Sequence, residues 1–217
     1  MNKKTKGIIA GAAGVALLAG GATFATWSDE LSLGGGSITA GNLDVAPLTA
    51  SGWYDASADR SDAVAIPGFL GTELGLTGHS IDAGTWRMVP GDKAVAAFPF
   101  QLALEGDNVV AELDVTGVTA LTTANVPVSI ALYDAAGDPV TVTAGKVRVK
   151  ATDSGTGITG LTVDRTTIDG SDTDADMTAV VTVDFANVTD QTLVESELVD
   201  LTDVGVTLTQ VRSGAGF

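Results

Sequence analysis

Short runs of alternating apolar and polar residues recur between residues 38 and 212, and helical periodicity is almost absent. Valine and threonine are abundant in these runs, and β-branched side chains suit a pleated sheet. Turn residues separate the runs, as expected for an all-β sandwich or barrel. The runs that we predict as strands are 38–45, 94–104, 109–118, 126–134, 140–142, 145–152, 161–168, 177–185 and 204–212. The only helix candidate in this part of the chain is the short segment 191–199.

Two features interrupt the regular alternation. Pro99 lies inside the long run 94–104, and because proline donates no ladder hydrogen bond, it predicts an edge position or a bulge. Residues 50–80 are irregular and rich in glycine, so we expect a loop insertion that packs its aromatic side chains on one end of the sandwich. Residues 135–138, with the sequence A-A-G-D, predict a hairpin turn.

The N-terminus has the pattern of a secretory signal peptide. Lys3, Lys4 and Lys6 precede the uncharged segment 7–21, and Thr23 and Ala25 place small residues before a cleavage site at Thr26. The apolar run is shorter than the roughly 20 residues of a spanning helix. We therefore expect cleavage after Ala25 and export, with an uncleaved membrane anchor as the alternative.

The charge of the chain restricts its partners. The formal net charge is −16, and removal of residues 1–25 leaves 8 basic against 27 acidic residues, a net charge of −19. Such a surface repels nucleic acid and anionic lipid, so we expect no nucleic-acid partner and contact with a membrane only in the precursor. The 217-residue chain has no cysteine, which excludes disulfides, thiol nucleophiles and zinc–thiolate sites.

Few residues could carry chemistry. His79 is the only histidine, which excludes a two-histidine metal site, and no nucleophile-elbow motif accompanies it. We expect no enzymatic activity and no cofactor. The run of Asp172, Asp174 and Asp176, with Asp169, resembles the start of a calcium loop but lacks its later glycine and glutamate, so a solvated hairpin tip is the alternative. Aromatic residues that could line a sugar-binding shelf, or belong to the core, are Trp53, Tyr54, Phe69 and Trp86.

Three blocks in the first half of the chain carry a family resemblance. The signal region continues into T-W-S-D at 26–29, residues 37–45 read S-I-T-A-G-N-L-D-V, and residues 88–93 read M-V-P-G-D-K before a long strand. In this order the blocks resemble the TasA/camelysin family of secreted Gram-positive proteins. The resemblance covers 1–48 and 86–105 best. Camelysin relatives are described as metalloproteases, but a zinc-binding pattern is missing here.

This resemblance implies a jelly-roll sandwich, preceded by a signal helix, that polymerises into biofilm-matrix fibres after cleavage by a SipW-like signal peptidase. The freed N-terminal strand of one subunit is expected to complement the sheet of the next, head to tail. Its candidate residues are Thr26, Trp27, Asp29, Leu31 and Leu33, and its hinge is Gly34, Gly35 and Gly36. The apolar residues at 27, 31 and 33 share one face of an extended chain. Pairing within the same subunit and disorder are the alternatives.

The predicted organisation follows from these features. Residues 1–25 form the signal peptide, 26–36 the donor-strand candidate with its hinge, and 37–217 one β-sandwich domain with the insertion 50–80. We expect a secreted structural subunit of a cell-surface or biofilm-matrix fibre whose main partner is itself. The other readings are a monomeric binding module for cell-wall glycan or a surface protein, and a camelysin-like protease.

Overall fold

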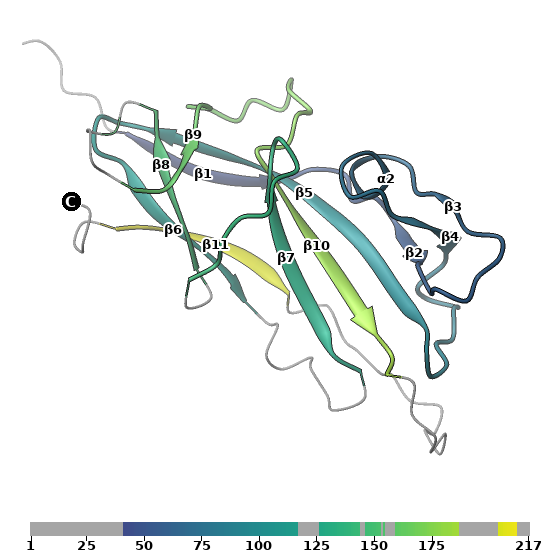
Figure 1. The fold of residues 1–217 in the computed structure, drawn as a ribbon. Helices are drawn as coiled ribbons and strands as arrows, with labels where there is room; N and C mark the ends of the chain where they lie inside the picture. Colours follow the sequence, from purple (N-terminus) through teal and green to yellow (C-terminus); the bar gives the residue numbers. More distant parts are fainter. Residues whose placement is uncertain are drawn as a thin grey trace, which may run out of the picture. The chain divides into compact units, whose positions relative to one another are not determined.

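The computed structural model describes residues 41–116, 126–143, 146–152, 154, 159–186 and 204–211, which all belong to one compact unit, residues 40–217. The regular secondary structure of the described part is almost all β-strand (Figure 1). Its strands are β1 (Asn42–Pro47), β2 (Trp53–Asp55), β3 (Val64–Ala65), β4 (Thr77–Ile81), β5 (Lys93–Glu105), β6 (Val110–Thr116), β7 (Val128–Asp134), β8 (Lys146–Ala151), β9 (Leu161–Val163), β10 (Met177–Asp184) and β11 (Gly205–Gln210). One short helix, α2 (Phe69–Thr72), accompanies them, and the prediction of an all-β fold is confirmed.

The strands form two sheets. The seven-stranded sheet has the order β3-β4-β2-β5-β10-β7, and β1 also pairs with β5. The four-stranded sheet has the order β11-β6-β8-β9. The pairs are antiparallel except β8 with β9, which run parallel. The turn at 105–108 joins β5 to β6 and therefore leads from one sheet to the other.

One hydrophobic cluster holds the two sheets together. Even-numbered side chains of β5 and odd-numbered side chains of β10 point from the large sheet toward the small one, as the period of two requires. We call this the inner face of the large sheet and the opposite side its outer face. The buried members of the cluster are Phe100, Leu102, Leu104, Ala111, Leu113, Leu132, Val147, Val149, Ala151, Val163, Met177 and Ala179.

The thirteen-residue strand β5 is the centre of the large sheet. β10 pairs along one of its edges, while β1 and then β2 pair along the other. Pro99 is therefore not on an edge strand, and that part of the prediction is wrong. The backbone of Pro99 faces the β1–β2 side, where its carbonyl accepts the N–H of Leu48. The five residues 48–52 lie opposite the three residues 97–99. The irregularity that accommodates the proline is therefore the two extra residues in the segment between β1 and β2.

The prediction that the insertion 50–80 is an irregular loop is wrong. The insertion supplies β2, β3 and β4 to the large sheet, together with α2. Leu70 of α2 is fully buried, and it packs with Ile66 on the outer face against β5 and β10. Phe69 meets Tyr133 of β7 edge-on, with ring centroids 5.6 Å apart. The buried members of this outer cluster are Ile66, Leu70, Val95, Ala97 and Val180.

Several boundaries also differ from the sequence prediction. The first strand begins at Asn42 and extends to Pro47, and residues 140–142 form no strand, although single bridges join Tyr133 to Pro139 and Thr143 to Lys146. The predicted hairpin turn at 135–138 is confirmed, since the N–H of Asp134 donates to the carbonyl of Asp138 and Gly137 has a φ of 83°. The helix candidate 191–199 lies outside the described residues.

Candidate functional site: the aspartate loop and the open side of the sheets

The residues predicted for processing and polymerisation lie outside the described part of the chain. They are Thr23, Ala25, Thr26, Trp27, Asp29, Leu31, Leu33, Gly34, Gly35 and Gly36. Their roles remain predictions. The structure describes a surface of the domain that follows them in the sequence. That surface includes the second half of β5, the aspartate-rich segment beside it, and the edges of the two sheets.

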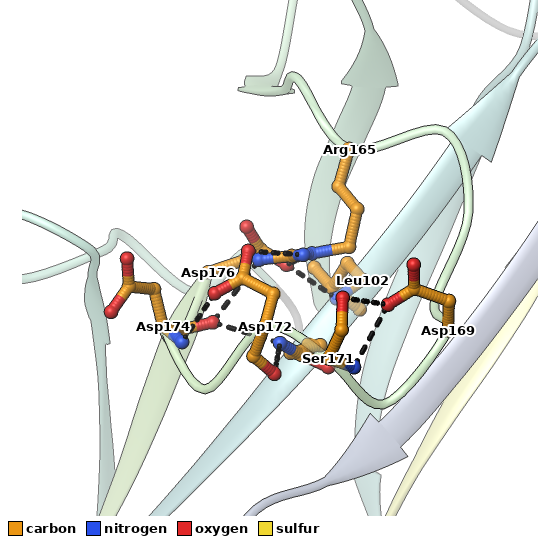
Figure 2. A network of polar contacts seen from close by, with 8 residues as sticks. Leu102, Arg165, Asp169, Ser171, Asp172, Asp174 and Asp176 are labelled. Carbon is orange, nitrogen blue, oxygen red and sulfur yellow. Dashed lines mark hydrogen bonds and ion pairs between the residues drawn. The ribbon is translucent and has the colours of Figure 1, made fainter.

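Arg165 organises the aspartate-rich segment 165–176, which we call the aspartate loop (Figure 2). Its Nε lies 2.9 Å from Oδ2 of Asp176, and its Nη1 lies 2.7 Å from Oδ2 of Asp172. A third guanidinium nitrogen donates to the carbonyl of Asp174. The Arg165 side chain is 15% exposed, so this fork of donors is largely shielded from solvent. One cation thus holds both ends of the D-x-D-x-D run.

The aspartate loop is attached to β5 by hydrogen bonds. Oδ2 of Asp176 accepts the N–H of Leu102 at 2.8 Å, and the carbonyl of Arg165 accepts the N–H of Leu104 at 2.9 Å. Gln101, which is 2% exposed, donates from Nε2 to the carbonyls of Asp172 and Asp174. The loop therefore continues the edge where β10 stops and covers the outer face of the second half of β5.

The electrostatics of the loop follow from these bonds. The backbone N–H of Asp174 and the Arg165 guanidinium lower the pKa of Asp172. The hydroxyl and N–H of Ser171 lower the pKa of Asp169, and the aspartates in turn raise the pKa of Arg165. Within the described ranges, no group of three or more histidines, cysteines or acids is arranged to hold a metal ion. The structure thus places the four calcium-candidate aspartates in one loop, with Arg165 facing two of them.

His79 and the four aromatic candidates are placed apart from this loop. His79 lies on β4 with its side chain 53% exposed, and its Nδ1 is 3.9 Å from Oδ2 of Asp62. Trp53 and Trp86 belong to a cluster on the inner face of the large sheet, whereas Tyr54 and Phe69 belong to the outer cluster. The four aromatic side chains are therefore divided between two faces and do not form a single shelf.

Sequence reasoning missed a buried polar centre at the start of the insertion. Asp55 is 3% exposed, and its Oδ1 accepts both the N–H and the hydroxyl of Ser57. Its Oδ2 accepts from Nη1 of Arg60 at 3.2 Å, and the Ser57 hydroxyl oxygen accepts the N–H of Lys93. The only sequence signal is the D-x-S spacing, which is typical of a turn in which a side chain binds nearby backbone. The arrangement ties the insertion to the first residue of β5.

The two sheets are joined differently on their two sides. On one side, residues 161–165 cross from β9 in the small sheet to Leu104 of β5 in the large sheet. On the other side lie β1 and β11, which are close to each other and end their respective sheets among the described residues. We call this second side the open side. Its inward-pointing residues are all only partly buried: Leu43, Val45, Val206 and Leu208.

Comparisons with known proteins gave no relatives: no family model, no curated protein and no solved structure matches the chain. Among the described residues, no helix is long and apolar enough to cross a membrane.

Proposed function

We propose that this protein is an exported structural subunit of a cell-surface or biofilm-matrix fibre that assembles by donation of its N-terminal strand. The open side of the two sheets carries this proposal. Partly buried apolar residues meet there beneath two sheet edges, and an added strand would cover them. An extended peptide that joins a sheet edge gains main-chain hydrogen bonds and buries its alternate side chains.

The sequence supplies a segment suited to this role. Residues 26–33 become the free N-terminus when the signal is cut after Ala25, and they precede three glycines that can act as a hinge. Head-to-tail donation produces an open filament rather than a closed ring. The resemblance to the TasA/camelysin family supports the same function, together with jelly-roll topology and an N-terminal signal helix.

The decisive test compares purified mature protein, residues 26–217, with a variant that lacks 26–33. We expect filaments by electron microscopy for the mature protein and none for the deletion variant. Circular dichroism and thermal melting should show that both proteins remain folded. A mature protein that stays strictly monomeric over a wide concentration range, with 26–33 ordered on its own sheet, contradicts the proposal.

A glycan-binding module and a protease receive less support from the described residues. The aromatic side chains that could form a sugar shelf lie on opposite faces of the large sheet. Nδ1 of His79 lies 3.9 Å from Oδ2 of Asp62, too far for a hydrogen bond, and within the described part no hydrogen bond joins its ring to a hydroxyl. We therefore propose neither as a second function.

A further inference from the structure

The two strand edges on the open side differ in their capacity to accept another strand. β11 has the sequence G-V-T-L-T-Q, with no charged residue and no proline. The N–H of Val211 donates to the carbonyl of Val110. The backbone N–H and C=O groups of the odd-numbered residues of β11 therefore point toward β6, and those of the even-numbered residues point away from the sheet. Within the described residues, the outward N–H and C=O groups of Val206 and Leu208 have no partner.

β1 is blocked by its own side chains. The N–H of Leu48 donates to the carbonyl of Pro99. The backbone N–H and C=O groups of the odd-numbered residues of β1 therefore point away from the sheet. The outward N–H of Val45 is already bound to Oδ1 of Asp44 at 2.8 Å, and Pro47 has no N–H. A charged side chain and a proline on an edge are the devices that natural sheets use against unwanted pairing.

The apolar side chains beside β11 are also left partly exposed at the end of the small sheet. The small sheet has four strands against seven in the large sheet, and β11 is its last strand on the open side among the described residues. Val206 and Leu208 point inward beside Leu43 and Val45 of β1, and all four remain partly exposed. A fifth strand beside β11 would place its inward side chains against these four residues.

We propose that the outer edge of β11, and not that of β1, receives residues 26–33 of a second copy of this chain. This inference rests on the proposed function and names the receiving surface. The eight-residue segment is long enough to span the six residues of β11. Its two carboxylates, Asp29 and Glu30, meet no acidic residue on β11, whereas β1 presents Asp44.

Side-chain parity restricts how the donor can be seated. Trp27, Asp29, Leu31 and Leu33 share one face of an extended chain. Leu31 and Leu33 therefore lie opposite Val206 and Leu208, and Asp29 falls at the end of β11, where its charge avoids the core. Ser28, Glu30 and Ser32 then share the solvent face with Thr207 and Thr209, which are exposed.

A matched pair of proline variants tests the choice of edge. Val206→Pro and Val45→Pro each replace a partly buried edge-strand valine whose N–H points away from its sheet. We expect Val206→Pro to abolish filaments and Val45→Pro to leave them intact, with thermal melting showing that both variants are folded. Loss of filaments in Val45→Pro alone overturns the inference while the proposed function stands.

Crosslinking tests the same contact without relying on a proline, because the chain has no cysteine of its own. Ser32→Cys protein is mixed with Thr207→Cys protein or, as the control, with Ala46→Cys protein, and a short thiol crosslinker is added. We expect crosslinked 32–207 peptides between copies in the first mixture. The control mixture should give no crosslinked 32–46 peptides. Crosslinks at 32–46 within filaments place the donor on β1 and overturn the inference alone.

A double variant, Ser32→Cys with Thr207→Cys, separates the two sources of the strand. If the crosslink forms only within monomers and no filaments appear, the segment belongs to the same copy. In that case both this inference and the proposed function are wrong. Crosslinked dimers and longer species that contain 32–207 peptides from two different copies support both.

Discussion

Arg165 and Asp176 form an ion pair that also fixes a buried strand, because the carboxylate oxygen 2.9 Å from Arg165 Nε accepts the N–H of Leu102. Leu102 is fully buried in the core between the sheets. Replacement of Asp176 by alanine therefore leaves a buried N–H without a partner, which costs about 1–3 kcal/mol. We expect a clear fall in the melting temperature for Asp176→Ala.

Asp174→Ala is the control in the same loop. The carboxylate of Asp174 has no hydrogen bond or ion pair within the described residues, and only its backbone participates in the network. Its stability should stay within about 0.5 kcal/mol of the wild type. Equal losses in both variants would show that the loop does not stabilise β5 through the carboxylate of Asp176.

Acid should weaken the aspartate loop. The pKa of Asp172 is lower in the folded protein than its ordinary value, chiefly because the backbone N–H of Asp174 and the Arg165 guanidinium favour the carboxylate. This stabilisation is fully present above the unfolded pKa of about 3.9 and is lost as the pH falls through the lower folded pKa. Melting temperatures between pH 5 and pH 2 should therefore fall less steeply in Asp172→Asn. A steeper fall in that variant would contradict the assignment.

Calcium should have little effect on this protein. Arg165 donates to Asp172 and Asp176, so a divalent cation at these oxygens would have to displace the guanidinium. We expect the melting temperature to be the same with added calcium chloride and with a chelator. An increase in melting temperature with calcium that is lost in Asp172→Asn would instead establish the calcium site.

The insertion 50–80 should contribute to global stability. Leu70 is fully buried on the outer face of the large sheet, and a buried leucine reduced to alanine costs about 2–5 kcal/mol. Val64 of β3 is 67% exposed, so Val64→Ala serves as the control and should change little. Chemical denaturation of Leu70→Ala measures the loss. An unchanged midpoint would mean that the insertion unfolds independently of the sheets.

Signal cleavage should depend on the small residue at Ala25. Replacement of Ala25 by a bulky phenylalanine should leave the precursor uncut, because the position before the cut accepts small side chains. Intact-mass measurement of the secreted protein checks this, with Thr26 expected as the first residue of the wild type. A secreted wild-type protein that still begins at Met1 would contradict the predicted processing.

Apolar patterning predicted most of the strands, because strands such as β6 and β8 have one apolar face toward the shared core and β5 and β10 are apolar on both faces. β6, β8 and β10 lie within the ranges that the sequence indicated. The pattern could not show that residues 105–108 lead from one sheet to the other, because a turn motif does not state where its second strand pairs. β2 and β3 of the insertion were missed because segments of three and two residues contain no measurable period. β4 has five residues, T-G-H-S-I, which do not alternate between apolar and polar.

The polar sites were harder to predict than the strands. The D-x-D-x-D run drew attention as a group of cation ligands, and the cation that it meets is Arg165, which is several residues away in sequence and in no motif with it. The D-x-S spacing at Asp55 indicates only a turn, because the burial of its carboxylate depends on tertiary packing. Pro99 indicated an interruption of the regular ladder, but the sequence could not show that the extra residues would lie in the segment 48–52 opposite it.

The pairing of β5 has a consequence for the order of folding. Its two edges are completed by β1 and β2 at residues 42–55 and by β10 at residues 177–184, from opposite ends of the described chain. Contacts so distant in sequence make folding slow, because a long loop must close before the strands can pair. A chain emerging from its N-terminus therefore cannot complete its central strand until nearly the last strand is present. Fragments truncated before residue 177 should remain unfolded and sensitive to proteases.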